Sequence, residues 1–204
     1  MASKIRNLEK TLLSDNWYTL NKCSFDYQRP DGTWQQQQRE VYDRGNGAAV
    51  LLYDPTTRSV VLTRQFRLPS FVNGNDDGML IEVCAGLLDD DEPEDCIRKE
   101  AEEETGFRVS EVTKVFESYM SPGAVTEILH LFVAQYDASM KVSSGGGLDD
   151  EQEHIEVLEL GFDDALAMVT AGEIKDAKTI MLLQYAQLQG LCESAPSDCQ
   201  TADT

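Results

Sequence analysis

Carboxylate side chains crowd one short segment of the chain. Residues 82–104 contain 11 acidic residues in 23 positions, and Glu100, Glu103 and Glu104 are three and four residues apart. On a helix this spacing brings the three carboxylates together on one side. Like charges so close repel each other unless a cation lies against them. Carboxylate oxygens without histidine or thiolate favour a hard ion, Mg²⁺ or Mn²⁺, which also binds substrate phosphates.

The same residues have a second interpretation, in which they form a solvated acidic helix face. Arg98 and Lys99 lie beside the glutamates and could match their charge, as on many surface helices. Spacing alone leaves both interpretations open.

Local signals indicate how the acidic helix is built. A glycine, Gly86, precedes the acidic run, Pro93 is a favoured first helical residue, and Gly106 is a favoured C-terminal cap. Ile97 and Ala101 share a face that can pack inward. We therefore predict a strand, a loop and then a helix from Pro93 to Thr105.

The remaining periodicity predicts an α+β protein with two parts. Alternation from Trp17 to Tyr42 around a turn at Arg29–Gly32 predicts a hairpin or small antiparallel sheet, in an N-terminal subdomain of residues 1–44. The main domain is expected over residues 45–191 and a disordered tail over 192–204. Its predicted strands are Ala48–Tyr53, Ser59–Phe66, Met79–Cys84, Val112–Tyr119, Ile128–Tyr136 and Ile155–Leu160, and its other helices are Phe162–Gly172 and Thr179–Leu191.

The amino-acid composition argues against several classes of binding partner and indicates the cellular compartment. The formal net charge is −20, and residues 82–204 carry −21 of it against +1 for residues 1–81, which argues against nucleic acid or an anionic membrane as the main partner. Five cysteines without a C-x-x-C pair and only two histidines support neither a disulfide framework nor a structural zinc site. The start MASKIRNLEK lacks an apolar signal-peptide core, so we expect a cytoplasmic protein without a membrane span.

The acidic segment resembles a known motif. Gly86, Glu92 and the run Lys99–Phe107 resemble the Nudix box G-x5-E-x7-R-E-U-x-E-E-x-G-U, with Lys99 in place of arginine and one residue fewer between Glu92 and Glu100. Leu62–Arg67 and Ser121–Gly123 are similar to segments of the nucleoside-diphosphate-sugar hydrolases in the ADP-ribose pyrophosphatase branch. The resemblance covers about residues 12–190 and implies the Nudix fold, a mixed β-sheet between helices, with a small N-terminal antiparallel β subdomain.

The resemblance also implies a site. Mg²⁺, with Mn²⁺ a possible substitute, is expected on the Ala85 carbonyl, Glu100, Glu104 and Glu151. Glu103, Glu151 and Glu153 are the expected catalytic carboxylates, the last two in an acidic loop, residues 145–154, whose glycines Gly145–Gly147 supply a hinge. The expected substrate contacts are Trp17, Gln38, Arg39, Glu40, Arg67, Ala85, Gly86, Leu87, Glu104, Glu127, Asp150, Glu151 and Lys178.

Several of these positions have plainer interpretations from the residues themselves. Arg67 could form an ion pair across strands, Lys178 could be a surface lysine at a helix start, and Trp17 could pack in the core instead of stacking on a base. The acidic loop could be a charged surface loop, and His154 could cap the returning strand.

The activity implied by the resemblance is hydrolysis of GDP-mannose to GMP and mannose 1-phosphate, with ADP-ribose as the alternative substrate. A nucleotide-sugar sensor without catalysis is the alternative of another class. Family members of this kind exchange the N-terminal subdomain between two subunits, so a homodimer is expected. The expected partners are a small nucleotide sugar and a second copy, with neither nucleic acid nor membrane.

Overall fold

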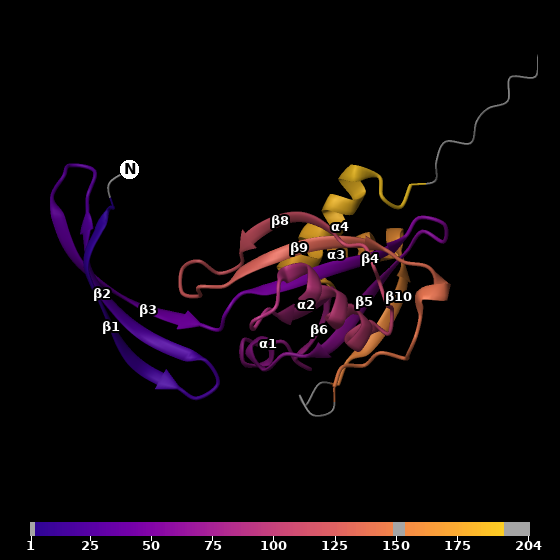
Figure 1. Cartoon of the computed structure of the whole chain (residues 1–204), viewed down its shortest axis with the longest axis horizontal. Coiled ribbons are helices and arrows are strands. Elements are labelled where there is room, and N and C mark those ends of the chain that lie inside the picture. The colour runs from indigo at the N-terminus through magenta and orange to yellow at the C-terminus, as the bar shows by residue number, and fades with distance from the viewer. Residues whose placement is uncertain (1–2, 149–153, 194–204) are drawn as a thin grey trace, which may run out of the picture. The chain divides into compact units, whose positions relative to one another are not determined.

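The structure is a computed structural model that describes residues 3–148 and 154–193. Contacts within the chain divide it into two units (Figure 1). Unit 1 comprises Met1–Asn46 and Ser118–Leu129, and unit 2 comprises Gly47–Glu117 and His130–Thr204. Residues 118–129, which the sequence analysis placed in the main domain, therefore belong with unit 1 by contact.

Unit 1 is built on a three-stranded antiparallel sheet in the order β1-β2-β3. The predicted hairpin is present as β2 (Thr19–Gln28) and β3 (Trp34–Asp43), with Gly32 at φ +85° in the turn. β1 (Ile5–Asp15) adds a strand that the sequence did not reveal, because register shifts and a positive φ at Asn7 interrupt its alternation. The Asp43 carboxylate accepts the Thr126 hydroxyl at 2.8 Å, and the Asn46 side-chain oxygen accepts the Ile128 N–H at 3.0 Å.

Unit 2 contains most of a seven-stranded sheet with the order β10-β5-β4-β9-β8, in which β6 pairs with β5 and β7 with β4. The α+β class and the mixed sheet with helices are as predicted. The strands are β4 (Gly47–Asp54), β5 (Ser59–Phe66), β6 (Met79–Glu82), β7 (Cys84–Leu87), β8 (Thr113–Tyr119), β9 (Ile128–Gln135) and β10 (Glu156–Gly161).

Helices cover the sheet on both faces. The helices are α1 (Leu68–Val72), α2 (Pro93–Glu100), α3 (Phe162–Ala171) and α4 (Ala177–Gln189), with a 3₁₀ turn at Ala138–Met140. Every residue of β4 from Gly47 to Leu52 is buried, and because strand side chains alternate, both faces of β4 are covered. Ala48, Val50 and Leu52 share a core cluster with Ile97 of α2. Helix α4 also packs on β4, but its residues are not part of this cluster (Figure 1).

The predicted strand Met79–Cys84 is divided in two at Val83. The first part pairs with β5 and the second with β4, and at the division the Val83 N–H donates to the Thr179 hydroxyl at 2.8 Å. The break leaves Ala85 and Gly86 on a short strand that packs against α2.

The C-terminal part of the described chain is packed as far as Cys192, which is buried. Cys192 is the first residue of the predicted tail, and residues 194–204 of that tail lie outside the described residues. Within the described chain, no helix combines the length and the apolar character that a membrane span requires.

Candidate functional site

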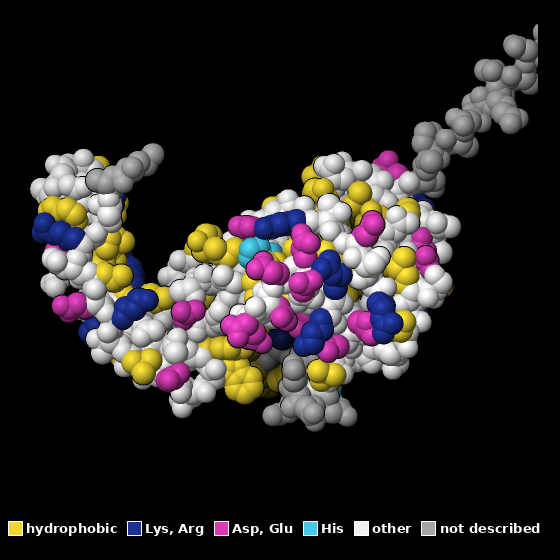
Figure 2. All heavy atoms as spheres, viewed as in Figure 1, with side chains coloured by type: hydrophobic (Ala, Val, Ile, Leu, Met, Phe, Trp, Pro, Cys, Tyr) yellow, Lys and Arg dark blue, Asp and Glu magenta, His cyan; other side chains and the backbone are white. Residues whose placement is uncertain are grey.

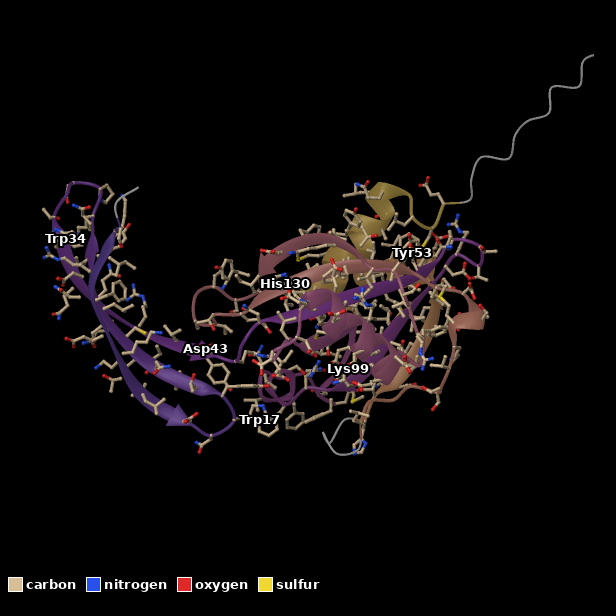
Figure 3. All side chains as sticks on the ribbon, in the orientation of Figure 1. Trp17, Trp34, Asp43, Tyr53, Lys99 and His130 are labelled. Atoms are coloured by element: carbon tan, nitrogen blue, oxygen red, sulfur yellow. The ribbon has the colours of Figure 1, made fainter. Side chains whose placement is uncertain are left out.

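The acidic residues of the helix fall into two sets that point in different directions. The outward set is ion-paired: Asp95 with Arg98 at 2.5 Å, and Glu102 with Arg108 at 2.7 Å. Acidic and basic side chains alternate over this surface (Figure 2), from which Lys99 extends (Figure 3). The solvated-face interpretation therefore holds for the outward set.

Glu103 lies at the border of the outward set. Its Oε2 is 3.8 Å from Lys99 Nζ, one turn earlier on the helix, and its side chain is half-buried. A half-buried side chain in this place keeps contact with water.

Glu104 points inward and is 1% exposed. Its Oε2 accepts the backbone N–H of Ala85 at 3.2 Å. The helix widens here: the residues after α2, Ala101–Thr105, form a π-helical turn that ends at Gly106 with φ +79°, the predicted glycine cap. Single π turns inside helices are frequent at functional sites, because they re-aim side chains.

Glu100 lies directly against β7. A methyl group placed on Gly86 would be 2.2 Å from Glu100 Oε1, so only glycine permits this approach. Both inward carboxylates also lie near the Cys84 thiol: burial raises its pKa well above the usual value, and Glu104 and Glu100 raise it further. A thiol with a raised pKa stays protonated, so Cys84 adds no third negative charge here.

The backbone of Ala85 faces the two inward carboxylates. Ala85 lies opposite Ala49 of β4, but its N–H donates to Glu104 instead of to β4. In an antiparallel strand the N–H and C=O of one residue point to the same side, so the Ala85 carbonyl also points away from β4. Glu100 lies against Gly86 and Glu104 binds the Ala85 N–H, so two predicted metal ligands lie next to the short strand that carries the third.

Part of the predicted site cannot be placed. Asp150, Glu151 and Glu153 lie outside the described residues. Among the residues that the structure describes, no three His, Cys, Asp or Glu side chains gather as a group able to hold a metal ion. His154, the last residue of the predicted acidic loop 145–154, is among the described residues and is exposed.

The predicted hinge glycines are bound to the end of the acidic helix. The N–H groups of Gly146 and Gly147 donate to the carbonyls of Glu104 and Glu103 at 2.9 and 3.2 Å. A Cβ on Gly145 would lie 2.5 Å from the Glu104 carbonyl oxygen, and all three glycines have positive φ. Close packing and positive φ therefore both favour glycine at these positions. The hydrogen bonds hold the start of the acidic loop against the end of the helix that carries the glutamates.

A buried ion cluster brings two predicted substrate contacts together. Glu82, at the end of β6, binds Arg67 Nε through Oε2 at 2.7 Å and Lys178 Nζ through Oε1 at 2.6 Å. Burial acts to raise the pKa of Glu82, but Lys178 and Arg67 lower it more, so the net pKa lies below its usual value. Burial likewise acts to lower the pKa of Lys178, but Glu82 and Asp176 raise it above its usual value. Glu82 and Lys178 therefore both stay charged at neutral pH.

The plain interpretation of Arg67 as part of a cross-strand ion pair is correct, since β6 pairs with β5. The plain interpretation of Lys178 as a surface lysine is wrong, because its side chain is only 10% exposed between two carboxylates. Sequence reasoning missed Glu82 altogether. Its one signal was an acidic residue inside a predicted apolar strand, where burial requires a cationic partner.

Of the other predicted substrate contacts that the structure describes, Leu87 ends β7 in unit 2 and the rest belong to unit 1. Gln38, Arg39 and Glu40 are exposed on β3, and Glu127 lies 3.5 Å from Arg44. Core packing of Trp17 is excluded because the residue is 79% exposed, and its ring makes an edge contact to Tyr18. Trp17 lies at one end of the three-stranded sheet and Trp34 at the other (Figure 3).

Comparisons with known proteins cover nearly all of the chain. A model of the GDP-mannose pyrophosphatase NudK N-terminal domain matches residues 4–42, and a model of the NUDIX domain matches residues 43–183. A protein from Yersinia enterocolitica named GDP-mannose pyrophosphatase is 59% identical over 94% of this chain and 99% of its own. Proteins with the same name from Pectobacterium atrosepticum and Salmonella typhimurium are 58% and 56% identical, over 93% and 95% of this chain and 97% and 100% of theirs.

Proposed function

The chain belongs to the Nudix hydrolase family, and on this basis we propose that it hydrolyses the diphosphate bond of GDP-mannose to give GMP and mannose 1-phosphate. The observation that carries the proposal is the similarity to proteins named GDP-mannose pyrophosphatase over almost the whole length of both chains, N-terminal sheet included. Substrate preference depends on a few contacts to base and sugar.

The described residues fit Mg²⁺, with Mn²⁺ as a substitute. Two carboxylates, Glu100 and Glu104, and the Ala85 carbonyl present oxygen atoms from one side, without sulfur or nitrogen ligands among them. Mg²⁺ prefers such ligands, keeps several waters and is held by few protein groups, so it does not need a complete protein cage. Glu151 is the further ligand that the family resemblance adds. When bound, the metal neutralises phosphate charge and polarises a phosphorus–oxygen bond.

Residues of the chain bind the cation, bind the substrate phosphate and position the attacking water. Glu100 and Glu104 supply the negative charge that holds the cation, and the buried position of Glu104 keeps competing water away. Arg67 offers guanidinium N–H groups to a phosphate. Glu103, Glu151 and Glu153 are the proposed carboxylates that orient or deprotonate the attacking water.

The test is to incubate the protein with Mg²⁺ and, separately, GDP-mannose, ADP-ribose or UDP-glucose, and to identify the released phosphates. GMP and mannose 1-phosphate are expected from GDP-mannose, at a rate that exceeds the others. Faster release of AMP and ribose 5-phosphate from ADP-ribose would show that ADP-ribose, and not GDP-mannose, is the preferred substrate. No turnover of any of the three, together with binding of one, would favour a sensor.

We also propose a homodimer. Apolar side chains of the N-terminal sheet, Ile5, Leu8, Leu12 and Leu13, are each about half exposed in one chain, and a second copy would bury them. The resembling family members exchange this subdomain between subunits. Light scattering at micromolar concentration is expected to give the mass of two chains, and the mass of one chain would contradict the proposal.

A further inference from the structure

Glu82 divides its two carboxylate oxygens between two cations. Oε2 accepts a hydrogen bond from Arg67 Nε at 2.7 Å, and Oε1 accepts one from Lys178 Nζ at 2.6 Å. The Glu82 side chain is 5% exposed. A carboxylate so enclosed is stable only while it is paired, so its contacts fix the orientation of both cations.

Further hydrogen bonds fix the end of β6, which carries Glu82, to the start of α4. Asp176 caps α4 by accepting the Thr179 N–H at 3.0 Å and the Thr179 hydroxyl at 2.6 Å, and it also binds Lys178 Nζ at 3.0 Å. The Thr179 hydroxyl in turn accepts the Val83 N–H, next to Glu82, at 2.8 Å. The end of β6 and the start of α4 are therefore joined, and Lys178 already binds two carboxylates.

Arg67 is by far the most exposed member of this cluster. Its side chain is 40% exposed, and among the described residues its guanidinium donates only through Nε. The two terminal nitrogens therefore keep N–H groups for another acceptor. A planar guanidinium held along one edge presents its remaining edge as a fork, which matches the oxygens of a phosphate.

We propose that Glu82 is a positioning residue, which holds Arg67 so that its terminal N–H groups are directed at the diphosphate of the substrate. The inference rests on the function proposed above, since it assigns Arg67 to that substrate. Glu82 acts through Arg67 and does not itself touch substrate. Lys178 keeps the Glu82 carboxylate charged and in place from the buried side.

A double-mutant cycle on KM and kcat tests the proposal. Arg67→Ala, Glu82→Gln and the double variant are compared with the wild type on GDP-mannose and Mg²⁺. Because one charge-assisted hydrogen bond is lost, Glu82→Gln should raise KM about tenfold or more, with kcat changed much less. In the Arg67→Ala background the same change should have almost no effect on KM, because the residue through which Glu82 acts is gone.

Two results would overturn the positioning role. The effects of Glu82→Gln and Arg67→Ala on KM could multiply independently, or Glu82→Gln could lower kcat and leave KM unchanged. Either result, with an active wild type, leaves the proposed function standing. An inactive wild type overturns the proposed function and the positioning role together, so the two failures are distinguishable.

The chain offers a matched control pair close by, with Arg64 on β5 three residues before Arg67 and Glu156 on β10. Arg64 is 38% exposed, close to the value for Arg67, and it binds Glu156 at 3.3 Å on the surface. Arg64→Ala and Glu156→Gln should each leave KM within about twofold, because exposed ion pairs contribute little. If Glu82→Gln fails to fold, the cycle is run with Lys178→Met throughout, which removes the buried cation that the lost carboxylate would leave unpaired.

Discussion

Glu104→Gln is expected to lower kcat for GDP-mannose by about three orders of magnitude, because a bound metal supplies several kcal/mol of charge stabilisation and about 1.4 kcal/mol corresponds to tenfold in rate. Glutamine keeps the size of the side chain and can still accept the Ala85 N–H, so the fold is expected to persist. The variant therefore separates charge from packing at a site that is 1% exposed. Steady-state kinetics and a thermal unfolding curve measure the two effects.

Glu102→Gln is the matched control for this variant. Glu102 lies two residues earlier, but it points outward and binds Arg108 on the surface. Its replacement should change kcat by no more than about twofold, as for most surface substitutions. Equal losses of activity in the two variants would mean that the net charge of the helix matters and the inward direction of Glu104 does not.

Gly86→Ala is expected to lower kcat/KM about a hundredfold while the protein stays folded, since a misplaced catalytic group can cost that much. The new Cβ would lie 2.2 Å from Glu100 Oε1 and 2.5 Å from Glu100 Cγ. These atoms belong to a flexible side chain, so the clash is relieved when Glu100 turns away and the backbone stays in place. Kinetics at saturating Mg²⁺, with a circular dichroism spectrum, check both parts.

Gly123→Ala is the control for the added methyl group. A Cβ at Gly123 would meet no atom within 4 Å, and this glycine does not have positive φ. Wild-type kinetics are expected from it. If Gly86→Ala kept full activity, the position of Glu100 against β7 would be irrelevant to turnover.

Residue patterns were sufficient to predict the acidic helix and its limits. Pro93 begins α2, and Gly106 ends the helical segment in the left-handed conformation that favours glycine. Both signals act locally, within one or two turns, so they can be recognised without knowledge of the tertiary fold. The family resemblance, carried by the glutamates between them, is likewise confirmed.

The direction of the glutamates could not be predicted from spacing. Regular helical geometry places Glu100, Glu103 and Glu104 together, but the π turn at Ala101–Thr105 and the strand break at Val83 decide which of them meet β7. Both features depend on packing between segments far apart in sequence. The solvated-face interpretation thus describes the outward acidic residues, and the metal-site interpretation of the inward ones stays a prediction.

The ion cluster was only partly visible in the sequence, for the same reason. Glu82 is separated from Arg67 by 15 residues and from Lys178 by 96. No periodic pattern links residues at such distances, so Arg67 and Lys178 were recognised as separate positions and the carboxylate between them was missed. An acidic residue inside a predicted apolar strand is the signal that points to such partners.

Whether Glu100 and Glu104 hold a divalent cation is tested most directly by electron paramagnetic resonance with Mn²⁺, whose free signal falls when the ion binds. Wild-type protein is expected to reduce the free signal, Mg²⁺ to restore it by competition, and Glu104→Gln and Glu100→Gln to bind far less Mn²⁺ than Glu102→Gln. Equal Mn²⁺ binding by the wild type and all three variants would contradict a metal site between α2 and β7.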